Sequence, residues 1–137
     1  MAYTLIDHTA DFGIHVSAET PTTLFSEAAD ALFDQIIDRQ SLKGETSIDL
    51  DVAGIDWPDL MVNWLRELLY LWNGRYVLIK AVEIHRLSER SLKATAYWDP
   101  YDPDRHVVRS EIKAVTYHQI RVTETPVGWE SKIIFDV

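Results

Sequence analysis

Cysteine is absent from this sequence of 137 residues. The chain therefore forms no disulfide and offers no thiolate for a metal site or for nucleophilic catalysis. Basic residues are also few: 13 basic side chains stand against 22 acidic ones, which gives a formal net charge of −9. Because unaided nucleic-acid binding depends on neutralising phosphates, we expect no stable direct binding to nucleic acid. The acidic excess suits solubility, a bound cation, or a protein partner with a basic surface.

Long apolar runs and the common enzyme motifs are missing too. No stretch approaches the roughly 20 apolar residues that a membrane span needs. The segment MAYTLIDHTAD lacks the basic and apolar regions of a signal peptide, so we expect a cytoplasmic protein without membrane contact. The sequence contains no GxxxxGK, GxGxxG, HExxH or GxSxG motif. It therefore does not predict a self-contained enzyme.

The hydrophobic pattern predicts a single α+β domain over residues 1–137. Apolar pairs that recur every four residues predict two amphipathic helices, one opened by Thr20–Pro21 and one running from Asp56 to Asn73–Gly74. Alternating or apolar runs predict strands at 12–16, 48–52, 76–85, 92–98, 111–122 and 129–137. This order is not a regular βαβ repeat. We expect both helices to pack on a mostly antiparallel sheet, which could be split or curled.

Carboxylates gather at both ends of the sequence. The segment DHTAD at 7–11 precedes a predicted strand, and Asp136 stands beside Val137. The simplest interpretation of the first segment is a loop whose side chains bond nearby backbone N–H groups. However, a strand after Asp11 would fix its direction, and the apolar residues 133–135 would hold the other end in a sheet. If the ends meet, the carboxylates of Asp11, Asp136 and Val137 form a hard-oxygen set suited to Ca²⁺, Mg²⁺ or Mn²⁺.

A lysine and three further polar side chains are candidate functional residues. In a continuous strand at 111–122, Lys113 would lie on one face and His118 on the other. Lys113 is by default a surface lysine, but near the acidic ends it could orient a carboxylate or contact phosphate. His118, on a mostly apolar face, is most simply a core histidine bonded to a carbonyl. Asp7 and His8 of the DHTAD segment complete the set.

Four segments, in this order, together resemble the archease family: DHTAD followed by Gly13–Ile14, then LMVNWLRELLYLW, EIKAVTYH and the terminal IIFDV. The similarity runs from residue 7 to the last residue, and Phe12 stands where the family more often has an aliphatic residue. The resemblance implies an α+β fold and a small metal-binding protein that is not itself an enzyme. It also implies a partner, an RtcB-type RNA ligase of tRNA splicing and RNA repair, whose guanylylation and multiple turnover this protein promotes.

The resemblance further implies which residues act. Carried over position by position, the metal ligands are Asp11, Asp136 and Val137, with Ca²⁺ as the first choice of cation and Mg²⁺ or Mn²⁺ as alternatives. Lys113 matches a further functional position. Two other functions stay open at this point. An open metal site can activate water, so the chain could be a metal-dependent phosphoester hydrolase; it could also be a chaperone-like protein-binding module.

Overall fold

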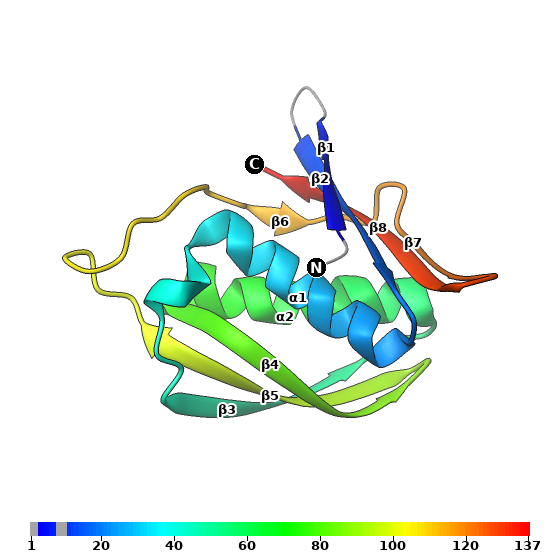
Figure 1. The fold of residues 1–137 in the computed structure, drawn as a ribbon, viewed down its shortest axis with the longest axis horizontal. Helices are drawn as coiled ribbons and strands as arrows, with labels where there is room; N and C mark the ends of the chain where they lie inside the picture. Colours follow the sequence, from blue (N-terminus) through cyan, green and yellow to red (C-terminus); the bar gives the residue numbers. More distant parts are fainter. Residues whose placement is uncertain (1–2, 8–10) are drawn as a thin grey trace.

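Two helices lie between two antiparallel sheets in the computed structural model of this chain, which describes residues 3–7 and 11–137 (Figure 1). The five-stranded sheet covers one side of the helix pair, and the three-stranded sheet covers the other. The α+β class is therefore confirmed, and the sheet is split rather than single. None of the described helices has both the length and the apolar character to cross a membrane.

Both helices begin where the sequence predicts. Helix α1 (Pro21–Ile36) follows Thr20, whose hydroxyl accepts a hydrogen bond from a backbone N–H of the first turn. Helix α2 (Trp57–Arg75) follows Asp56, whose carboxylate does the same. Such caps satisfy N–H groups that have no partner inside the helix. A proline in the first turn of each helix supports the same start, since its missing N–H costs nothing there.

The end of α2 differs from the prediction. The helix continues through Asn73–Gly74 and stops at Tyr76, which has a left-handed backbone with φ of 57°. The N–H of Tyr76 donates to the carbonyl of Trp72, which closes the last turn. The left-handed residue that ends the helix is thus Tyr76 instead of Gly74. A short 3₁₀ helix (Arg39–Ser41) follows α1.

The strands form two sheets with mixed chain order. The five-stranded sheet has the order β1-β2-β8-β6, and β7 also pairs with β8. The three-stranded sheet has the order β3-β5-β4. Their bounds are β1 (Tyr3–Asp7), β2 (Asp11–Ala18), β3 (Thr46–Ala53), β4 (Val77–Ser88), β5 (Ser91–Pro100), β6 (Ala114–Val115), β7 (Arg121–Thr125) and β8 (Gly128–Asp136).

The strand predicted at 111–122 is wrong as a single element. The chain pairs with β8 over Ala114–Val115, leaves it, and pairs again as β7. Gln119, between these two strands, has a left-handed backbone with φ of 52°. That conformation turns the chain and interrupts the alternation of faces. Side chains of this segment therefore do not follow the two faces that a continuous strand would give them.

The core lies where the two helices meet the sheets. Trp64 of α2 is fully buried, and its Nε1–H donates to the carbonyl oxygen of Phe25 on α1 at 3.0 Å. This bond pairs a buried indole N–H with an oxygen in the apolar interior. The largest fully buried side chains include Phe25, Phe33, Trp64 and Phe135. The apolar stripes of both helices thus form one core between the two sheets.

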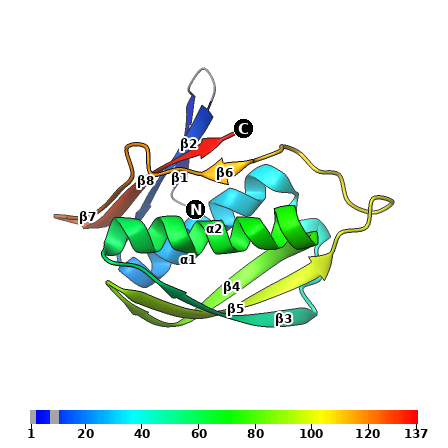
Figure 2. The same cartoon turned by 180° about the vertical axis from the view of Figure 1, so that it is seen from behind.

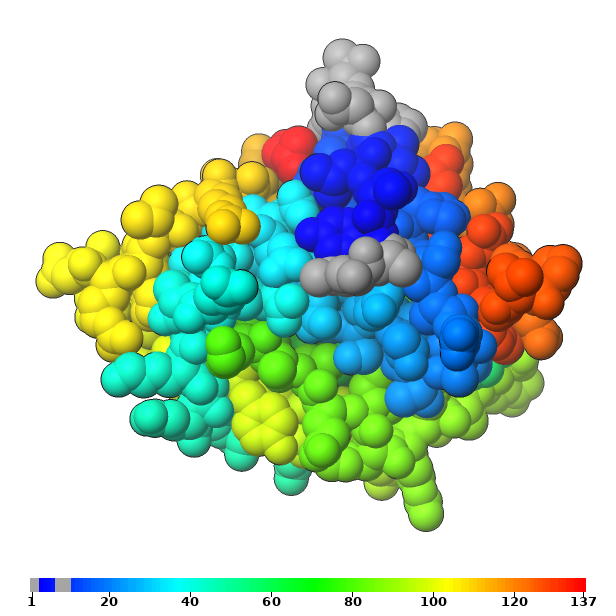
Figure 3. Space-filling model, viewed as in Figure 1, coloured from blue at the N-terminus to red at the C-terminus, as the bar shows by residue number. Residues whose placement is uncertain are grey.

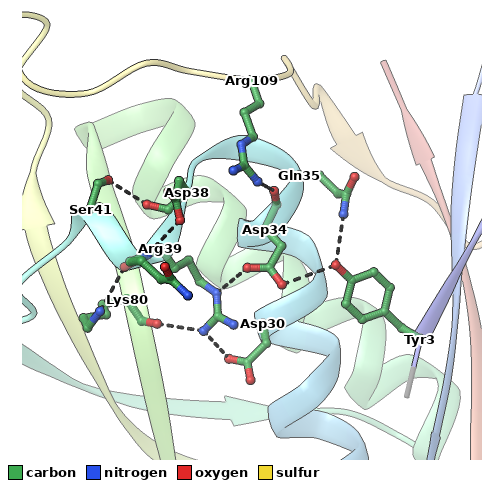
Figure 4. A network of polar contacts seen from close by, with 10 residues as sticks. Tyr3, Asp30, Asp34, Gln35, Asp38, Arg39, Ser41, Lys80 and Arg109 are labelled. Carbon is green, nitrogen blue, oxygen red and sulfur yellow. Dashed lines mark hydrogen bonds and ion pairs between the residues drawn. The ribbon is translucent and has the colours of Figure 1, made fainter. Parts of the chain in front are cut away.

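A polar network ties the N-terminal strand and the 3₁₀ helix to α1 (Figure 4). Arg39 donates from Nε to Asp34 at 2.6 Å and from Nη1 to Asp30 at 3.0 Å, and Nη1 also reaches the carbonyl oxygen of Lys80. The hydroxyl of Tyr3 donates to Asp34 at 3.3 Å. Burial raises the pKa of Asp30, while the guanidinium of Arg39 opposes that rise. The network joins β1 of the five-stranded sheet and β4 of the three-stranded sheet to α1.

Candidate functional site

The two ends of the chain meet in the five-stranded sheet. Strands β2 and β8 are antiparallel neighbours, and their register places Asp11 directly opposite Asp136. Side chains of directly opposed residues leave the same face of a sheet, with Cβ atoms about 4.5–5.5 Å apart. The C-terminal end of β8 lies beside the start of β2 in the ribbon and in the space-filling view (Figures 1 and 3).

Both carboxylates are accessible. Asp11 is half-buried, Asp136 is exposed, and Val137 follows with 47% of its surface exposed. These three residues are the ones whose sequence positions suggested a cation site. Among residues 3–7 and 11–137, no group of three or more His, Asp and Glu side chains lies close enough to hold a metal ion. The described side chains thus bring two carboxylates face to face, fewer than the about six to eight oxygen ligands that Ca²⁺ takes in proteins.

Apolar contacts set the register that creates this pair. The rings of Phe12 and Phe135, the next residues along the two strands, stack with centroids 5.4 Å apart. Gly13 faces Ile134, and a Cβ at position 13 would lie 2.7 Å from Ile134 Cδ1. Only a glycine permits this approach without displacement. A one-residue slip would turn the buried side chains outward, so burial enforces the opposition of Asp11 and Asp136.

The other side of β8 also holds Asp136 in place. Ala114 of β6 is the register partner of Asp136, and the N–H of Lys113 donates to the carbonyl oxygen of Asp136 at 2.8 Å. The backbone of Asp136 is thus held between β2 and β6, while its side chain is exposed. Lys113 is close to the acidic pair through its backbone, and its own side chain is exposed.

The three other candidate residues are His118, Asp7 and His8. His118 is exposed, not a core histidine, because β6 ends before it and the chain turns away. The buried histidine of the described chain is His106, whose Nδ1 accepts a hydrogen bond from the N–H of Asp102 at 3.0 Å. Asp7 ends β1 opposite Phe12, and His8 lies outside the described residues.

An anchoring contact that the sequence interpretation missed lies next to β6. The hydroxyl of Tyr117 donates to Asp59 of α2 at 2.7 Å. The guanidinium carbon of Arg66, also on α2, lies 4.7 Å from the centre of the Tyr117 ring, and its Nε–H donates to the carbonyl oxygen of Val115. No local pattern could reveal this contact, since Tyr117 and Asp59 are 58 residues apart. It fastens the segment after β6 to α2.

Comparison with known proteins decides the family of this chain. The model of the family described as the Archease protein family matches residues 3–137. The chain belongs to the archease family. It is 35% identical to the protein archease of Methanosarcina mazei, over 98% of this chain and 95% of the relative. It is 34% identical to the protein archease of Methanopyrus kandleri, over the full length of both.

A solved structure has the same fold. The solution structure of Methanobacterium thermoautotrophicum protein 1598 superposes with a TM-score of 0.84, at 25% sequence identity and with 99% of each chain covered. The family expected from the sequence is therefore confirmed. The α+β fold of an archease is confirmed with it. Asp11, Asp136 and Val137 all fall inside the region that matches the family.

The Tyr117 contact yields a prediction about pH. The Tyr117 hydroxyl, helped by the N–H of Ile55, lowers the pKa of Asp59 below its ordinary value of 3.8. A lowered pKa stabilises the folded state above the ordinary value, and this contribution is lost as the pH falls through the folded pKa. We expect Tyr117→Phe to raise the pKa of Asp59, and to destabilise the protein at neutral pH but not in strong acid.

An NMR titration of the Asp59 carboxyl, in the unmodified chain and in the Tyr117→Phe variant, measures the pKa of Asp59. Tyr70→Phe is the matched control, because Tyr70 is an exposed tyrosine on α2, the helix that contains Asp59. If Asp59 titrates identically in the Tyr117→Phe protein and in the unmodified chain, the contact does not persist in solution.

Proposed function

We propose that this chain is a metal-binding accessory protein that activates an RtcB-type RNA ligase in tRNA splicing and RNA repair, with no covalent step of its own. Membership of the archease family supports the identity of the partner. One structural observation carries the metal-binding part: Asp11 and Asp136, 125 positions apart in the sequence numbering, are register partners on adjacent strands. Two anions held this close repel each other unless a cation lies between them.

The donor set fits a hard divalent cation. The proposed ligands are the side-chain carboxylates of Asp11 and Asp136 and the α-carboxylate of Val137. Ca²⁺ is the preferred cation, and Mg²⁺ and Mn²⁺ are alternatives. Ca²⁺ takes about six to eight oxygen ligands, so three carboxylates fill only part of its shell. Water, a nucleotide phosphate or a partner side chain can take the remaining positions. When bound, the cation supplies a concentrated positive charge beside the ligase and its nucleotide.

The chain's own residues preorganise this site. The stacked rings of Phe12 and Phe135 hold the two strands in register, so the acidic side chains need little rearrangement to bind. The N–H of Lys113 holds the backbone of Asp136, and the Lys113 side chain is proposed to orient a carboxylate or contact phosphate. Roles for Asp7, His8 and His118 stay predictions from the sequence.

A multiple-turnover ligation assay tests the proposal. A cognate RtcB-type ligase is supplied with RNA, GTP and a divalent cation, with and without this chain. We expect the chain to increase the rate of ligase guanylylation and the number of products formed per ligase molecule. If the correctly folded chain fails to stimulate the ligase with Ca²⁺, with Mg²⁺ and with Mn²⁺, the proposal is contradicted. Hydrolysis of nucleotide or RNA by the chain alone would favour a hydrolase instead.

Extending the chain beyond Val137 tests the third ligand. A two-residue extension converts the α-carboxylate into a peptide group, and we expect it to weaken Ca²⁺ binding by about tenfold or more, the scale for damage to a metal site. Isothermal titration calorimetry measures the affinity. The same two residues added before Met1 serve as the control. Equal Ca²⁺ affinities of the two extended chains would exclude the Val137 carboxylate as a ligand.

A further inference from the structure

Three polar side chains of α2 contact the segment 112–117, which contains β6. Figure 2 shows β6 beside α2, with the C-terminal end of β8 on its other side. The three side chains follow one another at intervals of seven residues: Asp59, Arg66 and Asn73. Because seven residues make almost two full helical turns, these side chains lie on nearly the same side of the helix. We call this row the α2 clamp.

Two members of the clamp donate to the backbone of the segment. The side-chain amide of Asn73 donates to the carbonyl oxygen of Ile112 at 3.0 Å. The Nε–H of Arg66 donates to the carbonyl oxygen of Val115 at 3.1 Å. Seven helical residues rise about 10.5 Å and three extended residues span about 10 Å, so the spacing of the donors matches that of the acceptors. The helix and the segment run in opposite directions.

The third member of the clamp holds the end of the segment. The Tyr117 hydroxyl donates to the Asp59 carboxylate, and the guanidinium of Arg66 lies against the Tyr117 ring. The hydrogen bond from Tyr117 is the largest cause that lowers the pKa of Asp59, and the charge of Arg66 lowers it further. The members of the clamp therefore support one another.

The segment connects the clamp to the end of β8. Of the described strands, only β8 pairs with β6, so the backbone on the α2 side of β6 depends on side-chain donors. On the other side, the N–H of Lys113 donates to the carbonyl oxygen of Asp136, and the N–H of Thr116 donates to that of Ile134. One short segment is thus bonded to α2 and to the last residues of β8.

We propose that the α2 clamp positions the acidic pair, Asp11 and Asp136. The clamp fixes the segment, and the segment holds the end of β8 so that its carboxylate faces β2. The inference rests on the proposed function, which makes this pair a cation site. Arg66 and Asn73 are positioning residues that do not contact the cation. Without them, the carboxylates must be ordered when the cation binds, and the lost entropy weakens binding.

Cation binding by two clamp variants tests the proposal. Arg66→Met and Asn73→Leu each remove a donor and keep the approximate shape of an exposed side chain. We expect each to weaken Ca²⁺ binding by about tenfold, the lower end of the effect of losing an outer partner of a metal site. Isothermal titration calorimetry measures the affinity, and circular dichroism checks that each variant is folded.

Arg75→Met is the matched control for charge. Arg75 is exposed in the last turn of the same helix, and its substitution should leave the Ca²⁺ affinity of the chain unchanged. Loss of a positive charge by itself favours a bound cation. Weaker binding by Arg66→Met therefore does not come from net charge.

A double substitution shows whether the clamp acts through Asp136. If Arg66 positions the Asp136 carboxylate, Arg66→Met should weaken Ca²⁺ binding less in the Asp136→Asn chain than in the unmodified chain, because the two sites are coupled. An NMR titration measures these weaker affinities. Equal effects in both chains would indicate a general loss of structure and would overturn the proposal.

Amide hydrogen exchange of Lys113 tests the clamp without any cation. Arg66→Met and Asn73→Leu should make this N–H exchange up to about tenfold faster, the factor that loss of one hydrogen bond allows. Unchanged exchange in both variants would overturn the proposal. Faster exchange with unchanged Ca²⁺ affinity would also overturn it, since the acidic pair would then not depend on the clamp.

The outcomes separate this proposal from the proposed function. If the unmodified chain binds none of Ca²⁺, Mg²⁺ and Mn²⁺, the cation part of the proposed function fails, and the exchange of Lys113 still decides whether the clamp holds the end of β8. Faster exchange together with weaker Ca²⁺ binding in folded variants supports both.

Discussion

Asp11→Asn and Asp136→Asn should each abolish stimulation of the ligase while leaving the fold intact. Each substitution keeps the shape of the side chain and removes one of the two facing negative charges. Cation affinity should fall by about tenfold to a hundredfold, the range found even for damage outside the direct ligands of a metal site. Neither side chain is part of the apolar core, so the free energy of unfolding should change by no more than about 0.5 kcal/mol.

The multiple-turnover ligation assay, with Ca²⁺ affinity and circular dichroism measured on the same preparations, checks this expectation. Glu89→Gln is the matched control, because Glu89 is an exposed carboxylate in the turn between β4 and β5. It should stimulate the ligase like the unmodified chain. Full stimulation by both aspartate variants would refute a role for the terminal carboxylates. Loss of stimulation by Glu89→Gln as well would point to net charge, not to this site.

Trp64→Ala should have the largest effect on stability. The side chain is fully buried, and its indole N–H donates to the carbonyl oxygen of Phe25. Alanine leaves a cavity between the helices and removes this hydrogen bond, so the free energy of unfolding should fall by about 3–5 kcal/mol. Because native proteins are stable by only about 5–15 kcal/mol, this change would leave the protein close to unfolding.

Urea denaturation followed by circular dichroism measures this loss. Tyr70→Ala, on the outward side of the same helix, removes an exposed aromatic ring and should change stability by no more than about 0.5 kcal/mol. Trp64→Phe keeps most of the side-chain volume, so its free energy of unfolding should lie between those of Trp64→Ala and Tyr70→Ala. A loss of less than about 1 kcal/mol in Trp64→Ala would mean that the helix pair does not depend on this side chain, contrary to its burial.

The two effects act on separate parts of the molecule. Trp64 lies in the core between the sheets, whereas the acidic pair lies at one end of the five-stranded sheet. The packed core holds the five-stranded sheet in place, and the pairing of β2 with β8 in that sheet brings the two carboxylates face to face. A destabilised variant should therefore lose function by unfolding, and an acidic-pair variant should lose function while folded. Measuring stability and stimulation together distinguishes these causes.

Local patterns were sufficient for the helices and for the strands with one buried face. Thr20 and Asp56 cap the two helices as predicted, because capping involves only neighbouring backbone groups. The alternation of Ile14 and Val16 with polar residues marks β2, whose buried face has a period of two residues. Strand β1 was not predicted. Leu5 in its middle is exposed, so no clear alternation marks this edge strand.

Prediction from the sequence was wrong or incomplete where contacts between segments far apart in the chain determine the local structure. The interruption between β6 and β7 depends on pairing with β8, and it explains why His118 is exposed rather than buried. The contact of Tyr117 with Asp59 joins segments that are far apart in the sequence. The cavity lined by Leu69, Tyr70 and Val115 likewise exists only because α2 packs beside residues 113–115. None of these contacts leaves a local pattern.

By itself, the sequence determined the α+β class, the helix starts, the acidic character of both ends and the resemblance to the archease family. Each depends on residue type and short-range spacing. Only the tertiary structure decided that Asp11 faces Asp136, because strand pairing is chosen by burial of apolar residues across the whole sheet. The physical reason is that register is a property of two strands packed on one core, and neither strand contains it alone.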